Sequence, residues 1–124
     1  MESPAGEGED RDQEGRAVNL DSNRAYDALI RAGDDWADKN AAADLLEETK
    51  KSVLAKLKNE ADAKSEAARE SLALCHQDYR AHVESMVEAR KQANRARVRY
   101  DAAKVLAEMR RSEESTRRAE MTMR

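Results

Sequence analysis

One short stretch of the chain combines side chains that can bind a metal ion: Cys75, His76, Asp78 and His82. Two ligands on one helix are usually three or four residues apart, because that spacing places them on the same face. The two histidines are six residues apart and fall on different faces, which leaves Asp78 and His82 as a single pair. The spacing favours ordinary surface contacts, and we expect neither a metal site nor a cofactor.

No pattern of residues indicates an enzyme. The chain lacks a glycine-rich phosphate loop, a nucleophile elbow and the Glu-x-x-His motif of di-iron helical bundles. Cys75 is the only cysteine, so an intramolecular disulfide is excluded. A lone cysteine is typical of a small buried hydrophobic side chain, and we expect Cys75 to be one. We therefore expect a protein that does not catalyse a reaction.

The clearest chemical signal is a basic segment at the C-terminal end. Residues 90–124 hold eleven basic and five acidic side chains, a net charge of +6, whereas the other residues together carry −9. Nine of the eleven are arginines, whose planar guanidinium suits bidentate contacts with carboxylates and phosphates. We expect the following arginines to contact a partner: Arg90, Arg95, Arg97, Arg99, Arg110, Arg111, Arg117 and Arg118.

Two kinds of partner fit these arginines. Nucleic acid would bring phosphates, and its binding would weaken steeply with salt. A protein partner would bring carboxylates, such as the acidic residues that this chain itself carries between positions 34 and 48. The net charge of −3, the interspersed glutamates and the lack of aromatic residues for base stacking favour a protein partner. Direct binding of DNA is the alternative, and a solvated face is the plainest interpretation.

The arginines belong to a region without helix breakers. All four glycines and the one proline lie in the first 33 residues, and the next 91 residues contain neither. Strong helix formers, mainly Ala, Glu, Lys, Arg and Leu, fill most of these positions, which predicts an all-α protein. One helix of this length would extend about 137 Å, so the chain must fold back or associate.

The N-terminal region has a different composition. Residues 1–23 hold seven acidic side chains, two arginines and three of the glycines, which predicts a disordered acidic tail before a helical domain over residues 24–124. Residues 23–32 carry apolar side chains at helical spacing. We expect a short helix there that ends at Gly33 in a left-handed conformation, and a new helix that begins at Asp34 or Asp35.

The apolar spacing predicts an antiparallel helical hairpin similar to a coiled coil. The first arm runs to about residue 61, and the chain reverses over residues 59–65, where the only apolar residues are alanines. Ser65 can cap the returning helix, which runs from Glu66 to about Arg118 with a break near residues 76–78. The side chains expected in the core or at a subunit interface are Trp36, Leu46, Val53, Leu57, Tyr79, Val83, Met86 and Tyr100.

The returning helix carries a second apolar stripe beside the first, formed by Val87, Val98, Val105, Leu106 and Met109. Two stripes allow one helix to touch more than one neighbour, which suits a hairpin that also dimerises. The first arm has about 27 residues and the second about 50. We therefore expect some 20 C-terminal residues to lack a partner within the hairpin and to meet another subunit or a ligand.

The interior is lean in large side chains. Of 49 hydrophobic residues 23 are alanine, and the chain has no phenylalanine. Because a well-buried large side chain contributes only about 1.5 to 3 kcal/mol before entropy is subtracted, a lone monomer would be only marginally stable and a homo-oligomer is expected.

No apolar run approaches the roughly 20 residues of a membrane span, and the N-terminus lacks signal-peptide features. These features predict a cytoplasmic protein with no membrane contact.

Residues 87–101 (VEARKQANRARVRYD) and 110–121 (RRSEESTRRAEM) carry a resemblance to a known class of proteins. From about Trp36 to the C-terminus, the chain resembles small helical accessory proteins of tailed bacteriophages and prophages, whose genes tend to lie near recombination functions. The resemblance implies a setting in the cytoplasm of a bacterial host. We expect a non-enzymatic adaptor that self-associates and presents its arginine-rich helix to a protein partner in DNA recombination. A virion or assembly component is a further alternative.

Overall fold

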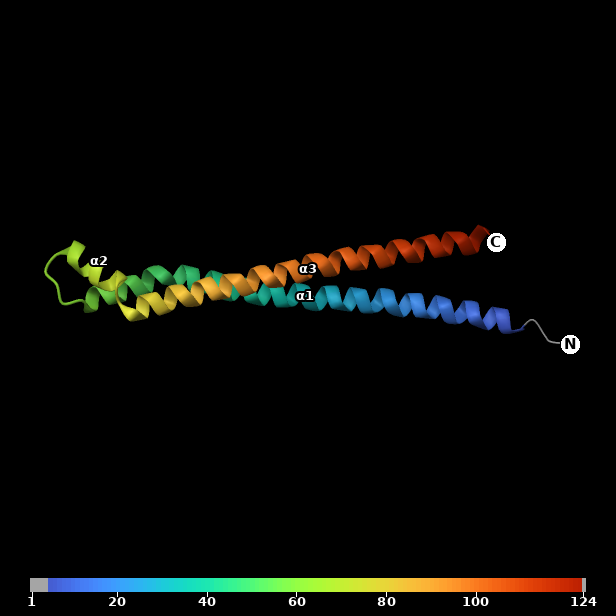
Figure 1. Ribbon diagram of the computed structural model, residues 1–124, viewed down its shortest axis with the longest axis horizontal. Helices are drawn as coiled ribbons and strands as arrows, with labels where there is room; N and C mark the ends of the chain where they lie inside the picture. The colour runs from blue at the N-terminus through green and yellow to red at the C-terminus, as the bar shows by residue number, and fades with distance from the viewer. Residues whose placement is uncertain (1–4, 124) are drawn as a thin grey trace. The chain divides into compact units, whose positions relative to one another are not determined.

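The computed structural model describes the backbone of residues 5–123 and the side chains of residues 22–123. Three helices occur in this part of the chain: α1 (Ala5–Glu60), α2 (Glu66–Leu74) and α3 (Gln77–Met123) (Figure 1). No strand forms between residues 5 and 123, so the all-α prediction is confirmed. Most of the expected acidic tail, residues 1–23, lies outside the residues whose side chains are described.

Contacts divide the chain into two units, to which α1 and α3 both contribute. The terminal unit comprises residues 1–34 and 98–124, and the turn unit comprises residues 35–97. In both units a segment of α1 packs against a segment of α3 that runs in the opposite direction. The predicted helical hairpin with a long C-terminal helix is therefore confirmed.

The reversal in the turn unit lies where the sequence predicts it. α1 ends at Glu60 and α2 begins at Glu66. Ser65 caps α2, because its Oγ accepts a hydrogen bond from the Ala68 N–H at 3.1 Å. The break before α3 is also present, and there His76 Nδ1 accepts the Asp78 N–H at 3.0 Å. A histidine side chain thus accepts a hydrogen bond from the first turn of α3, a role that we did not predict for His76.

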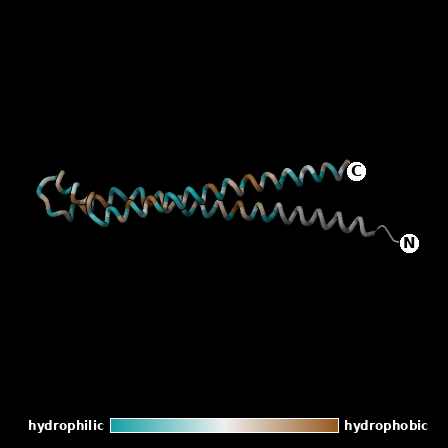
Figure 2. The backbone as a smooth tube through the Cα atoms, viewed as in Figure 1, coloured by the Kyte–Doolittle hydropathy of each residue, from teal (hydrophilic) through white to brown (hydrophobic). Residues whose placement is uncertain are grey.

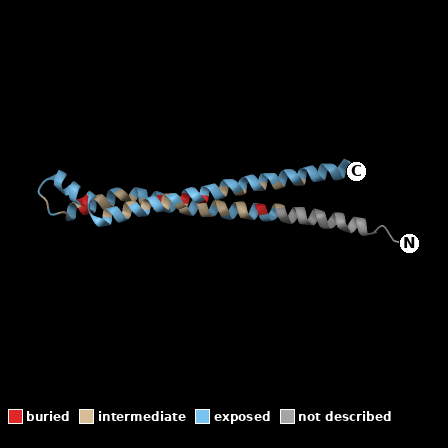
Figure 3. Ribbon diagram, in the orientation of Figure 1, coloured by how far each residue is buried: buried red, intermediate tan, exposed pale blue. Residues whose placement is uncertain are grey.

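Alanines make up most of the buried residues of the turn unit. Its buried residues are Ala43, Leu57, Ala73, Ala93 and Ala96 (Figure 3). Small side chains let two helix backbones approach closely, but they bury little apolar surface. Figure 2 shows hydrophilic and hydrophobic residues interleaved along the described parts of the long helices. Over these residues, no helix has an apolar stretch of the length that a bilayer requires.

The terminal unit is packed more sparsely. Of its described residues, only Ala25 is buried. Ser22 Oγ donates a hydrogen bond to Glu114 Oε2 at 3.0 Å, and Tyr100 lies against Gly33. These two contacts set the antiparallel register of α1 and α3 in this unit.

The expected helix end at Gly33 is wrong. α1 continues through this residue, and no described glycine has a positive φ. A Cβ at Gly33 would lie 3.3 Å from Cε2 of Tyr100, so the missing side chain gives room to the ring. A glycine inside a helix costs about 1 kcal/mol, an amount that packing can offset.

The expected difference in arm length is also wrong. α1 has 56 residues, and α2 and α3 together have 56 as well (9 and 47). α3 contacts α1 of the same chain at least as far as Glu114. The expectation failed because it began the first arm after Gly33, whereas α1 already includes the residues before it. The C-terminal part of α3 therefore cannot be treated as a free extension.

Candidate interaction surface

Arg90 of α3 makes four hydrogen bonds to side chains of α1 in the same chain. Its Nε and Nη2 donate hydrogen bonds to the two carboxylate oxygens of Glu47 at 2.9 and 3.0 Å. Nη2 also donates to Asp44 Oδ1 at 2.6 Å, and Nη1 donates to Asn40 Oδ1 at 2.8 Å. All three guanidinium nitrogens are thus bonded to α1 within the turn unit.

Arg90 therefore forms a charged link between α3 and α1, and we call this set of contacts the Arg90 clamp. Hydrogen bonds to Glu47 and Asp44 hold the pKa of Arg90 above its usual value. Bidentate guanidinium–carboxylate pairs are among the stronger polar contacts and demand a specific geometry. Arg90 was expected to contact a partner, but its position joins α3 to α1 instead. The acidic partners that the sequence suggested for a neighbour are here supplied by the same chain.

Three further arginines are engaged by neighbouring side chains. The Arg97 guanidinium lies over the Trp36 ring, 5.8 Å from the ring centroid, at the limit of a cation–π contact. Arg110 and Arg118 form ion pairs with glutamates of their own helix, Glu113 and Glu114. Exposed pairs of this kind contribute little to stability, but they reduce the charge presented to a partner. Arg99 also takes part in an interaction.

The remaining predicted arginines form the part of the set that is open to a partner. Arg95, Arg111 and Arg117 are exposed, and none makes a hydrogen bond or ion pair with another described side chain. The structure therefore reduces eight candidate arginines to three whose guanidinium groups are not committed within residues 22–123.

A second kind of candidate surface is apolar. The stripe that the sequence places beside the core, Val87, Val98, Val105, Leu106 and Met109, is exposed along its whole length. In the terminal unit α1 adds two more exposed apolar side chains, Tyr26 and Ile30. Patches of this kind on a soluble protein usually mark a surface that contacts another molecule.

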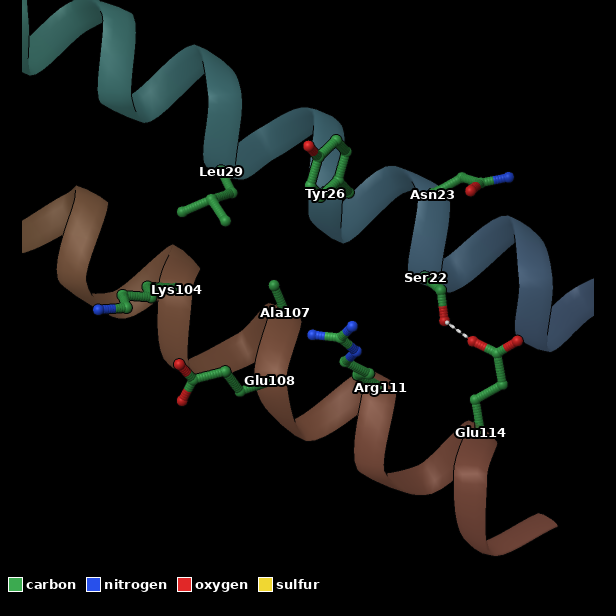
Figure 4. A pocket seen from close by; sticks show the side chains of 9 residues that line it. All are labelled: Ser22, Asn23, Tyr26, Leu29, Lys104, Ala107, Glu108, Arg111 and Glu114. Atoms are coloured by element: carbon green, nitrogen blue, oxygen red, sulfur yellow. Dashed lines mark hydrogen bonds between the residues drawn. The ribbon is translucent and has the colours of Figure 1, made fainter. Parts of the chain in front are cut away.

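An open groove of about 460 Å³ lies between α1 and α3 in the terminal unit (Figure 4). Leu29 and Ala107 line it from opposite helices, and Tyr26 extends along the α1 side. Lys104, Arg111, Glu108 and Glu114 line the α3 side, so the groove combines apolar groups with side chains of both charges.

None of the expected core residues is fully exposed, although only one of them is buried. Leu57 is buried. The other seven are half-buried: Trp36, Leu46, Val53, Tyr79, Val83, Met86 and Tyr100. Partial exposure follows from a two-helix arrangement, in which a side chain at the contact has protein on one side only.

The candidate metal ligands do not converge. His82 Nε2 lies 2.8 Å from the Leu46 carbonyl oxygen, and His76 caps α3. Cys75 is exposed at the C-terminal end of α2, so the expectation of a buried thiol is wrong. The nine-residue helix α2 buries only Ala73, which leaves its end without a covering element. Over the described part of the chain, no three metal-binding side chains come together.

Sequence reasoning missed the Arg90 clamp, although the residues that form it leave a signal. Asn40, Asp44 and Glu47 are separated by four and three residues and therefore share one face of α1. That signal becomes interpretable only when the register of the two helices is known.

Comparisons with protein-family models, with curated proteins and with solved structures give no match.

Proposed function

We propose that this chain is a non-enzymatic helical adaptor that self-associates and offers uncommitted arginines of α3 to a protein partner. One observation carries the proposal. Five of the six buried residues among those described are alanines, whereas twelve large apolar side chains are exposed. A hairpin with this distribution gains apolar burial mainly by association.

Some arginines of α3 have partners within the chain and others do not, and this difference supports the proposed contact with a protein partner. Arg90 and Arg97 are used within the hairpin, whereas Arg95, Arg111 and Arg117 are not. Acidic side chains of a partner would satisfy these guanidinium groups by bidentate contacts. Because exposed charges set specificity and association rate more than affinity, we expect the apolar surface to supply most of the binding energy.

Self-association is tested by sedimentation equilibrium over a wide range of protein concentration. We expect a mass above that of one chain, with helicity and thermal stability that rise with concentration. A monomer that remains helical and unfolds cooperatively at every concentration would overturn this half of the proposal.

Partner binding is tested by capturing proteins from a bacterial lysate on the full chain. The test variant carries Arg95→Ala, Arg111→Ala and Arg117→Ala, and the control carries Lys51→Ala, Lys56→Ala and Lys64→Ala, which remove the same charge from exposed positions elsewhere. We expect a protein held by the wild type and the control to be lost from the test variant. Equal capture by all three proteins would contradict a role for these arginines.

Direct binding of DNA gains no support from the contacts, because five of the eight candidate arginines have partners in the chain itself. Labelled DNA titrated at low and moderate salt checks this alternative, since phosphate binding must appear at low salt and fade as salt rises. The phage and recombination setting rests on the sequence resemblance alone, and the alternative of a virion component rests on the lean helical interior.

A further inference from the structure

The two units differ in how much apolar surface their helix contacts bury. The turn unit buries five residues, of which Leu57 is the largest, whereas Ala25 is the only buried residue among those described in the terminal unit. Local stability follows the number of buried apolar contacts, so a segment with few of them opens more readily than the rest of a protein. The terminal unit is therefore the weaker of the two packed regions.

The polar contacts between the helices follow the same division. In the turn unit Arg90 donates four hydrogen bonds from α3 to α1, and His82 Nε2 lies 2.8 Å from the Leu46 carbonyl oxygen. In the terminal unit the Ser22 hydroxyl donates a hydrogen bond to Glu114. Because bidentate pairs between charged groups are the stronger kind of hydrogen bond, the Arg90 clamp adds to the advantage of the turn unit.

The groove of the terminal unit shows where its packing is incomplete (Figure 4). Leu29 and Ala107 line the groove from opposite helices, and Tyr26 beside them is 60% exposed. Apolar side chains that border open space make fewer van der Waals contacts than side chains that interlock. Separating α1 from α3 here thus loses less contact energy than separating a fully packed pair of helices.

Gly33 provides a position at which α1 can bend. It is the last glycine of the sequence, and it lies one residue before Asp34, where the α1 segment of the terminal unit ends. Glycine has the greatest backbone freedom of all residues and weakens the interior of a helix. The α1 segment of the terminal unit therefore carries its weakest backbone position close to its end.

We infer that the terminal unit is a pair of helical arms that opens by bending of α1 about Gly33 while the turn unit stays folded. Opening makes Ala25, Leu29 and Ala107 accessible. Isolated helices of about 12 to 15 residues are only marginally stable in water, so each open arm also loses part of its helical hydrogen bonding. This opening is a property of the single chain and does not require the proposed self-association.

Amide hydrogen exchange along the full chain tests the opening, at a protein concentration low enough to minimise association. We expect the protection factors of residues 22–34 and 98–114 to be at least about tenfold lower than those of residues 40–57 and 79–97. Residues 22–34 lie inside α1, so low protection there is not fraying of a helix end. Equal protection in both sets, or stronger protection in the first set, overturns the inference.

Two matched substitutions show whether the terminal unit opens separately. Ala25→Glu places a charge at a buried position, and Ala102→Glu places the same charge at an exposed one. We expect Ala25→Glu to lower the protection of residues 98–114 at least about fivefold and to leave residues 79–97 unchanged, because a buried unpaired charge disrupts the contact around it. Ala102→Glu should change neither set. A loss of equal size in both sets, or no loss in residues 98–114, overturns the separate opening.

Gly33→Ala tests the position of the bend. Alanine stiffens α1 at this residue, so the protection of residues 98–114 should rise about two- to fivefold, with no change in residues 79–97. Since the substitution lies in α1 and the measured amides lie in α3, a rise there reports the closure of the two arms against each other. Unchanged or lower protection in residues 98–114 overturns the bending about Gly33.

Discussion

Gly33→Ala offers the sharpest test of how the terminal unit is packed. Gly33 lies in the interior of α1, where replacement of glycine by alanine stabilises a helix by about 0.8 to 1.0 kcal/mol. The opposing effect is steric. The new Cβ would lie 3.3 Å from Cε2 of the Tyr100 ring, slightly closer than ordinary contact, and 3.5 Å from Cδ2, an ordinary contact distance.

The net change in stability on Gly33→Ala depends on which atoms must move to relieve this contact. These two atoms belong to the edge of the Tyr100 ring rather than to the backbone, and a shift of a few tenths of an ångström restores normal separation. A side-chain rotation of about 30° costs some 0.5 to 1.5 kcal/mol, and the rotation needed here is much smaller. The helix propensity therefore outweighs the contact. We expect a net stabilisation of about 0.5 to 1 kcal/mol.

Thermal unfolding followed by circular dichroism measures the effect at one fixed protein concentration. The expected stabilisation corresponds to a rise of roughly 2 to 6 °C in Tm. Ala37→Gly, the reverse change at an exposed position of α1, is the matched control and should lower stability by about 0.8 to 1.0 kcal/mol. A lower Tm for Gly33→Ala would refute the reasoning, because it would mean that the Tyr100 ring cannot yield or that Gly33 ends a helix.

Four other substitutions test single contacts by unfolding. Ala96→Leu should destabilise the protein by about 1 to 3 kcal/mol because Ala96 is fully buried, whereas Ala119→Leu at an exposed position of α3 should be nearly neutral. Arg90→Ala should lower the urea midpoint more than Arg95→Ala does; equal effects would mean that the clamp contributes nothing. Ser65→Ala should cost about 0.5 to 2 kcal/mol by removing the α2 cap, and the exposed Ser71→Ala serves as its control. A hydrogen bond from Lys58 lowers the pKa of Glu66, so this pair stabilises the fold above the ordinary glutamate pKa of 4.5 and loses its effect as the pH falls through the lowered value. Glu66→Gln should remove that part of the acid dependence, and an unchanged profile would contradict the pairing.

The helical content and the place of the reversal could be predicted from local properties of the chain. Residues 59–65 combine polar helix competitors with small side chains, and Ser65 is a strong capping residue, so the turn follows from short-range chemistry. Gly33 was misjudged for the opposite reason. A lone glycine permits both a helix end and a helix interior, and the choice depends on Tyr100, which lies 67 positions further along the chain.

The basic composition of the candidate surface could be predicted from the sequence, but which of its arginines have partners within the chain could not. The basic character of α3 is a property of its sequence, yet which arginines remain uncommitted depends on the side chains that α1 places opposite them. Arg90 and Arg95 are five positions apart on the same helix, and only the first reaches carboxylates of α1. The exposure of the second apolar stripe likewise depends on which side of α3 meets α1.

The amino-acid sequence alone determined that this chain is helical, that it reverses once near residue 60 and that its interior is built from alanine, because helix propensity, capping and side-chain volume act over a few residues. Only the tertiary structure decided that α1 passes through Gly33, that the two arms match in length and that Arg90 joins them. These features depend on the register between segments far apart in the chain, and that register is set by many weak contacts acting together, which no local pattern encodes.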